Sequence, residues 1–167
     1  MHIKTLIAMK KEGYKKKIMD EVVKLSIDSV ENGGGPFSAA IVKDGKIVAT
    51  GVNRVTANHD PTAHAEVMAI RNACEKLNTY DLSDCEIYSS CEPCPMCLGA
   101  IYWARIPELF YCNTQQDAKE INFDDSFIYD ELAKSPEERS LDMVRVDNTE
   151  AIKAFQLWDK KEDKTPY

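Results

Sequence analysis

The sequence predicts an α/β fold in which helices cover the faces of a mostly parallel sheet that begins with an antiparallel hairpin. Short strand-like apolar runs alternate with longer segments of helical period, which is the pattern of strands joined by helical crossovers. An Asp44-Gly45 pair separates the first two runs, and such a pair accepts the positive φ angles of a tight hairpin. The 167 residues are enough for one domain with a single core, and no internal repeat interrupts them.

The elements are predicted in order from the amino terminus. A first helix at 14–32 has apolar residues on one side and charged residues on the other, and glycines at 33–35 end it. Two strands, at 37–43 and 46–53, form the hairpin. The prediction contains five strands in all. The later elements are a helix at 63–77, a strand at 86–90, a helix from about 95 to 104, a strand at 108–112, a helix at 128–133, a strand at 143–146 and a helix at 150–160.

Composition and charge narrow the class of protein. The chain carries 21 Lys and Arg against 28 Asp and Glu, and the net charge of −7 argues against a protein that grips a long nucleic-acid backbone. No apolar run reaches the roughly 18 residues of a membrane span, and the opening residues do not resemble a secretory signal, so we expect a cytoplasmic protein. In that reducing compartment the six cysteines are expected to bind metal or to stay free.

Three side chains have the chemistry and the spacing of a zinc site. His64 lies in a Pro-Thr-Ala-His-Ala-Glu run, and Cys94 and Cys97 follow in a Cys-Glu-Pro-Cys-Pro-Met-Cys run. Because the two cysteines are three residues apart, both can face one ion from the first turn of a helix. One imidazole and two thiols suit tetrahedral zinc whose fourth position is left to water, which is typical of a catalytic site.

Glu66, two residues after His64, is the predicted general base. The two residues are about 200° apart around a helix axis, so their side chains can converge only beyond the end of the helix. We therefore expect the metal between two helix N-termini. Zinc with two thiolates is formally neutral and acidifies its water less than an all-histidine site does, so a neighbouring base is useful. Glu66 would take the proton of that water and pass it to the substrate.

Each of these patterns has other interpretations when it stands alone. A His-x-Glu pair is common on helix surfaces, and Pro-Cys-x-x-Cys is compatible with a redox pair, a structural zinc knuckle or, with Cys91, an iron–sulfur site. The two patterns occur together, each after a β element and ahead of a helix, and this combination favours zinc. Cys74, Cys85 and Cys112 are expected to be buried small hydrophobic residues.

The combined pattern of His64-Ala65-Glu66 and Pro93-Cys94-x-x-Cys97 resembles the signature of the zinc nucleobase deaminases. Longer stretches, at 60–66, 90–105 and 123–129, are similar to the small bacterial guanine deaminases of the cytidine deaminase-like superfamily. The resemblance implies a three-layer αβα fold with a mixed sheet, zinc on the histidine and the two cysteines, and the glutamate as proton shuttle. It implies hydrolysis of guanine to xanthine and ammonia.

The resemblance also implies residues that bind the base. Phe37 and Trp103 would form apolar or stacking walls of the pocket, and Ala65 is included among the substrate contacts. Asn53 would hydrogen-bond the purine, and Asp125 would hold the guanine edge and help to move protons to the leaving amine. From the residues alone, the two aromatics are compatible with core packing, Asn53 with a strand end, and Asp125 with an ordinary helix start.

The ends of the chain carry two further expectations. The whole chain, 1–167, is predicted to be one domain with an N-terminal tail at 1–13. The resemblance implies a homodimer whose subunits exchange C-terminal segments. The segment at about 149–167 would then bring Tyr167 over a neighbour's pocket. Ser38 departs from the family pattern, in which glycine is expected.

Three other functions remain open from the sequence. A tRNA adenosine deaminase shares the Asp-Pro-Thr-Ala-His-Ala-Glu run, although it must bind a folded RNA, which the acidic charge disfavours. Free cytosine deamination uses the same chemistry. A zinc module that only mediates protein contacts would not need the open metal position or the neighbouring glutamate.

Overall fold

The computed structural model describes the backbone of residues 3–166 and the side chains of residues 13–166. Within it the chain forms two compact units, one ending at Ile128 and the other beginning at Tyr129. No helix in the described part of the chain combines the length and the apolar character needed to cross a membrane.

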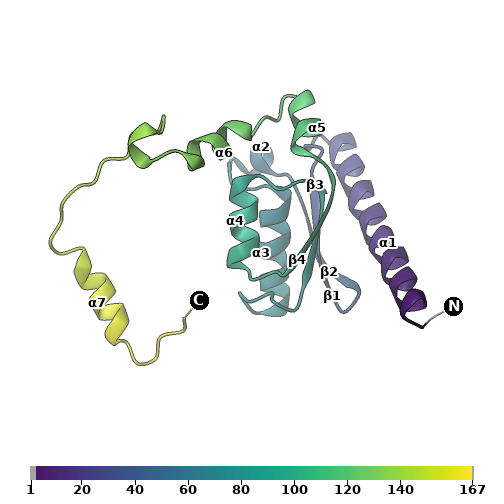
Figure 1. Cartoon of the computed structure of the whole chain (residues 1–167), viewed down its shortest axis with the longest axis horizontal. Helices are drawn as coiled ribbons and strands as arrows, with labels where there is room; N and C mark the ends of the chain where they lie inside the picture. The colour runs from purple at the N-terminus through teal and green to yellow at the C-terminus, as the bar shows by residue number, and fades with distance from the viewer. Residues whose placement is uncertain (1–2, 167) are drawn as a thin grey trace. The chain divides into compact units, whose positions relative to one another are not determined.

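A four-stranded mixed sheet lies at the centre of the first unit (Figure 1). Its strand order is β2-β1-β3-β4; β1 is antiparallel to both β2 and β3, and β3 is parallel to β4. The strands are β1 (Ser38–Lys43), β2 (Lys46–Val52), β3 (Glu86–Cys91) and β4 (Glu108–Asn113).

The α/β class and the opening hairpin are confirmed, but the expectation of a mostly parallel sheet is wrong. The helical crossover after β2 makes β3 run in the same direction as β2, as the alternation of elements predicts. However, β1 lies between β2 and β3 in the sheet, so β3 pairs with β1 and not with β2. The pair that forms is therefore antiparallel.

The predicted fifth strand at 143–146 is also wrong, because the described residues form four strands. The segment lies in the second unit, where Met143, Val144 and Val146 are exposed. A short segment with three apolar residues becomes a strand only when a neighbouring strand satisfies its backbone groups. No such pairing exists for this segment within the described chain.

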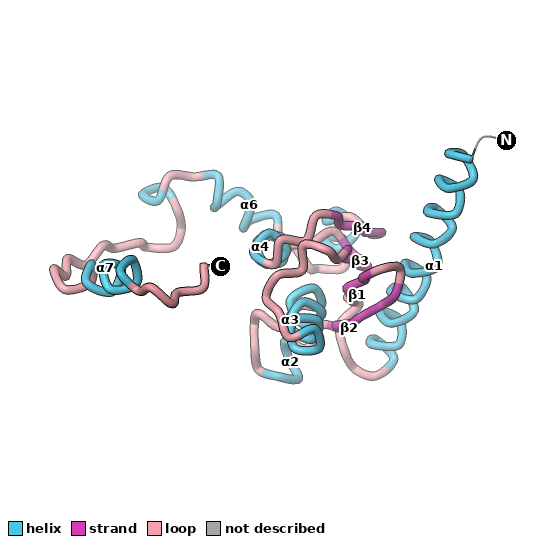
Figure 2. Tube along the Cα trace, turned by 90° about the horizontal axis from the view of Figure 1, so that it is seen from below, coloured by secondary structure: helices cyan, strands magenta, loops and turns pink. Residues whose placement is uncertain are grey.

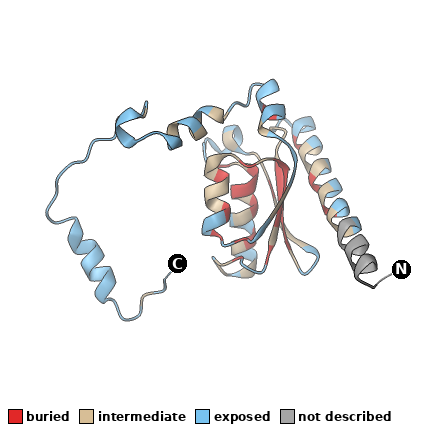
Figure 3. Ribbon diagram, viewed as in Figure 1, coloured by how far each residue is buried: buried red, intermediate tan, exposed pale blue. Residues whose placement is uncertain are grey.

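Helices cover both faces of the sheet, so the first unit has three layers (Figure 2). On one face, Ile18 and Val22 of the first helix pack with Tyr88 of β3. On the other face, α3 and α4 enclose the larger apolar cluster, and the buried residues follow these contact surfaces (Figure 3). The helices of residues 3–166 are α1 (Ile3–Glu31), α2 (Val55–Asn58), α3 (Ala65–Leu77), α4 (Pro95–Trp103), α5 (Gln115–Glu120), α6 (Ser126–Ala133) and α7 (Ile152–Lys160), with a 3-10 turn at Pro136–Glu138.

Two small residues set how closely the helices approach the sheet. A Cβ added at Gly51 of β2 would lie 2.3 Å from the carbonyl oxygen of Ala65 and 2.4 Å from the amide nitrogen of Ala69, so the glycine lets the first turn of α3 rest directly on the strand. Ser38, where glycine was expected, is buried, and its Oγ donates a 2.6 Å hydrogen bond to the carbonyl of Val22. This bond ties α1 to β1. The backbone is helical from Ile3, so α1 starts earlier than the predicted residue 14.

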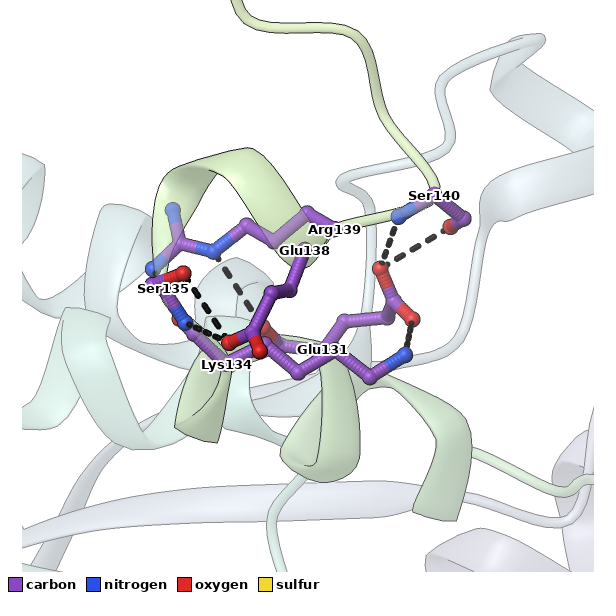
Figure 4. A network of polar contacts seen from close by, with 6 residues as sticks. All are labelled: Glu131, Lys134, Ser135, Glu138, Arg139 and Ser140. Carbon is purple, nitrogen blue, oxygen red and sulfur yellow. Dashed lines mark hydrogen bonds and ion pairs between the residues drawn. The ribbon is translucent and has the colours of Figure 1, made fainter.

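Polar contacts around Glu131 organise part of the second unit (Figure 4). One oxygen of Glu131 pairs with Lys134, and the other accepts hydrogen bonds from the amide and the hydroxyl of Ser140, at 2.6 and 2.9 Å. Arg139 donates to the Glu131 carbonyl at 3.2 Å. The contacts with Lys134 and Ser140 lower the pKa of the Glu131 carboxyl to about 2.

Candidate active site

The site is built where two helices begin on the same face of the sheet. His64 is the residue immediately before α3, and Cys94 is the residue immediately before α4. Both have extended backbone angles, and Pro95 then starts α4 without losing a needed hydrogen bond. Cys97 lies in the first turn of α4. Because α3 and α4 pack in one layer, the three side chains converge beyond their N-termini, as the sequence predicts.

The three donor atoms form a nearly equilateral triangle. His64 Nδ1 lies 3.6 Å from Cys94 Sγ and 3.5 Å from Cys97 Sγ, and the two sulfurs are 3.5 Å apart. Zinc bonds of about 2.3 Å to sulfur and about 2.0 Å to nitrogen, at tetrahedral angles, separate the ligand atoms by about 3.5 to 3.8 Å. The triangle therefore has the size that a zinc ion requires. Among the described residues, these three form the group that could hold a metal ion.

The environment of the thiols favours metal binding. Contact with the Cys97 thiol and then with the His64 imidazole lowers the pKa of Cys94 to about 4. The same contact, together with burial, raises the pKa of Cys97. One thiolate therefore forms readily, and a bound cation would supply the charge that the second thiolate needs, since metal binding releases the protons of its ligands.

Glu66 lies beside this triangle in the first turn of α3. Its side chain is nearly enclosed, with 6% of the residue exposed, and the Ser89 hydroxyl donates a 2.9 Å hydrogen bond to Oε1. Burial raises the pKa of the Glu66 carboxyl, because it disfavours the charged form. A carboxylate in this state accepts a proton more readily than one at the surface.

A cavity of about 560 Å³ opens in front of the triangle, and its lining lies entirely within the first unit. This volume is in the usual range for small-molecule sites, about 300 to 1,000 Å³. The predicted residues that line it are Phe37, Asn53, His64, Ala65, Glu66, Cys94 and Asp125.

The local structure explains how two of the predicted base-binding residues reach the cavity. The backbone N–H of Asn53 donates a 3.1 Å hydrogen bond to the backbone carbonyl of Phe37, and this bond holds the two ends of the hairpin together at the cavity. The Asn53 Oδ1 accepts from the amide of Val55 at 3.2 Å, so its NH₂ group can face a ligand. Asp125 is the residue immediately before α6, and burial raises the pKa of its carboxyl.

Trp103, predicted to form a wall of the pocket, is not brought to this cavity. Trp103 is the last residue of α4 and 71% exposed, and the rise of a helix places it about 13 Å along the axis from Cys94. Trp103 does not line the cavity. Tyr167 lies outside the described residues.

Sequence reasoning did not single out Ser89 or Phe123. The Phe123 ring meets Phe37 edge to face, with centroids 5.0 Å apart and planes at 89°, and both line the cavity. Phe123 lies in an irregular segment before α6, where no periodicity points to it. The signal for Ser89 was present, because the alternation along β3 places it on the same face as Ile87, which packs beneath α3 and α4. Glu92, Gln115 and Asn122 also line the cavity without having been predicted.

A site of one histidine and two cysteines, open on one side and flanked by a buried glutamate between two helix starts, defines a zinc-dependent hydrolytic class of protein. Residues 13–113 match the family model of the cytidine and deoxycytidylate deaminase zinc-binding region, and the chain belongs to this family.

Two relatives differ in how much of this chain they match. The chain is 53% identical over 150 residues to the guanine deaminase of Bacillus subtilis (strain 168), which covers 89% of this chain and 96% of the relative. The X-ray structure of guanine deaminase from Bacillus subtilis superposes with a TM-score of 0.88, at 52% identity, over 91% of this chain and 98% of that one. A tRNA-specific adenosine deaminase of Aquifex aeolicus (strain VF5) is 46% identical over 81 residues, 48% of this chain and 54% of the relative.

Proposed function

We propose that this protein hydrolyses guanine to xanthine and ammonia with the help of zinc. The observation that carries the proposal is the convergence of His64, Cys94 and Cys97 beside the buried Glu66, in a cavity large enough for a purine base. The similarity to a guanine deaminase over nearly nine-tenths of the chain supports guanine as the base.

His64, Cys94 and Cys97 would hold the metal. When bound there, zinc supplies a Lewis acid that lowers the pKa of water in the open position. The protein contributes the geometry, since the three donor atoms already lie at tetrahedral spacing.

Glu66 would move the protons of the reaction. Its carboxylate accepts a proton from the attacking water and later delivers a proton to the exocyclic nitrogen of the base. The carbon–nitrogen bond to the amine breaks and a carbon–oxygen bond to the water oxygen forms, so guanine and water become xanthine and ammonia. Its burial and raised pKa suit a group that must hold a proton between these two steps.

The cavity residues would orient the base. Phe37 and Phe123 supply aromatic surface for a flat ring, and Ala65, which follows His64 in the chain, also lines the cavity. The Asn53 NH₂ group would donate to a purine acceptor. Asp125 would accept from the N–H groups of the guanine edge and assist departure of the amine.

A second copy of the chain would complete the site. We propose a cytoplasmic homodimer in which the C-terminal segment at about 149–167 closes a neighbour's pocket with Tyr167, and in which Trp103 serves a pocket other than its own. The exposed apolar side chains of α7 support a role in contacts between copies. They are Ile152, Phe155, Leu157 and Trp158.

Ammonia release from free guanine, adenine and cytosine, and from tRNA, tests the proposal. The zinc-loaded protein should release ammonia from guanine at a rate at least tenfold above the other substrates, and liquid chromatography should identify xanthine. Release from tRNA but not from guanine would instead establish the second candidate function, tRNA adenosine deamination. The 81 residues that are similar to the Aquifex relative support this candidate. Full zinc occupancy without ammonia from any substrate would establish a non-catalytic zinc module.

A further inference from the structure

A buried hydroxyl on the central sheet contacts the group proposed to move the protons. Ser89 Oγ donates to Glu66 Oε1 at 2.9 Å, and Ser89 is 1% exposed. The two residues lie 23 positions apart in the sequence and come from different elements, β3 and α3. Bulk water therefore does not compete for this bond, and chain connectivity does not impose it.

The two partners differ in how firmly they are held. Ser89 pairs with Ala39 of β1 on one side and with Tyr111 of β4 on the other, so its backbone is fixed by two ladders. Its side chain has one rotatable bond to the oxygen. Glu66 has three rotatable bonds and projects from the first turn of a helix. The hydrogen bond therefore holds the Glu66 carboxylate at a fixed position relative to the sheet.

The hydroxyl can keep this contact through a proton transfer. A serine Oγ has one donor and two acceptor positions, so it donates to an ionised carboxylate and can also accept from a protonated one. While Oε1 stays with Ser89, Oε2 remains for the water and the base. A hydrogen bond to an ionised group is also stronger than one between neutral groups.

We propose that Ser89 is a positioning residue that fixes Glu66 Oε1 and so presents Oε2 to the reacting water. The proposal rests on the proposed deamination, since it assigns Ser89 to the proton-transfer step of that reaction. Ser89 itself does not line the cavity and acts through Glu66.

The test uses Ser89→Ala and Ser89→Thr in the zinc-loaded, full-length protein. Loss of a hydrogen bond to a charged group predicts that Ser89→Ala lowers kcat for guanine about 10- to 100-fold. KM should stay within about threefold, because the base does not contact Ser89, and zinc content should not change. Ser89→Thr retains the hydroxyl and should recover most of the lost kcat.

Ser90→Ala is the matched control. Ser90 is equally buried on the same strand, but it faces α1, and its Oγ accepts a 3.0 Å hydrogen bond from the amide of Ser38. Its removal should lower the melting temperature as much as Ser89→Ala does while leaving kcat within about twofold. A crystal structure of Ser89→Ala should show the Glu66 carboxylate in a different or split orientation.

The outcomes separate the two proposals. If wild type deaminates guanine and Ser89→Ala has the same kcat as Ser90→Ala, the positioning role is overturned. An unchanged Glu66 orientation in the Ser89→Ala crystal structure overturns it as well, whether or not guanine is the substrate. If the wild-type protein releases no ammonia from guanine, the proposed function fails, and the crystallographic comparison alone decides the role of Ser89.

Discussion

Different kinds of contact stabilise each of the two compact units of this chain. In the first unit, apolar side chains are buried on both faces of a sheet between helices, and the candidate site lies at one end of these layers. In the second unit, hydrogen bonds and ion pairs centre on Glu131 and Ser140 at the surface. Large apolar side chains of that unit are exposed, namely Leu141, Met143, Val144, Val146, Phe155 and Leu157.

This difference indicates which part of the molecule can keep side chains at fixed distances from one another. Close-packed layers resist small displacements, so ligand atoms carried on them keep their spacing. Surface polar contacts exchange with water and contribute little each. Substitutions at the metal site and in the packed layers of the first unit should therefore change zinc binding, rate or stability strongly, whereas those in the polar network around Glu131 should change only local order.

Removal of a metal ligand should give the largest effect. Cys97→Ala leaves two donor atoms, and we expect zinc content far below one ion per chain together with loss of measurable deamination. Metal analysis and ammonia release measure the two quantities on the same sample. Cys85→Ala is the control, since the Cys85 side chain is as buried as that of Cys97 but is not part of the triangle. An inactive Cys97→Ala protein that kept a full complement of zinc would contradict the role as a ligand.

Loss of the general base should be nearly as large. Glu66→Gln keeps the shape of the side chain but cannot accept a proton, so kcat should fall by about 10²- to 10⁴-fold. Zinc content and melting temperature should stay close to those of wild type. Steady-state kinetics with guanine measure the effect, and a kcat within tenfold of wild type would remove Glu66 from the proposed mechanism.

The part of the site that could be predicted depends on local spacing. Cys94 and Cys97 are three residues apart at a helix start, and helix geometry alone makes their side chains neighbours. The placement of His64 and Glu66 off the end of α3 follows from the same geometry. The hairpin was predictable because Asp44-Gly45 determines its turn, and both residues have positive φ in the structure.

The features of the fold and the site that could not be predicted depend on contacts between segments that are distant in the sequence. Alternating elements predict the direction of β3 but not that it lies beside β1. The period of a strand predicts the face on which Ser89 lies, but not that Glu66 is its partner. Trp103 was assigned to the pocket by resemblance, and the length of α4 separates it from the metal ligands of its own chain.

The close approach of α3 to the sheet should be costly to disturb. In Gly51→Ala the new methyl group would meet backbone atoms of Ala65 and Ala69 that cannot move independently. We expect a loss of about 2 to 3 kcal/mol in the free energy of unfolding, with weaker zinc binding, because α3 carries Glu66 and follows His64.

Gly99→Ala is the matched control for this substitution. Gly99 lies within α4, and an added Cβ would meet nothing within 4 Å. Alanine should stabilise the helix by about 0.5 to 1 kcal/mol. Urea denaturation monitored by circular dichroism measures both variants, and equal stability of the two would show that the approach of α3 is not tight.

The smallest effect is expected from the polar network of the second unit. Its hydrogen bonds hold the pKa of Glu131 at about 2, below the value of an unfolded chain, so their contribution is present above the unfolded-state pKa and is lost as pH falls toward 2. Amide hydrogen exchange at Ser140 should therefore accelerate in Glu131→Ala at neutral pH, because the acceptor of the Ser140 amide is lost, while kcat and zinc content stay unchanged. Glu137→Gln removes an equal charge from the same unit but leaves the acceptor of Ser140 in place. If both variants protected Ser140 as well as wild type does, surface polar contacts would not organise this unit, and its order would have to come from its exposed apolar side chains.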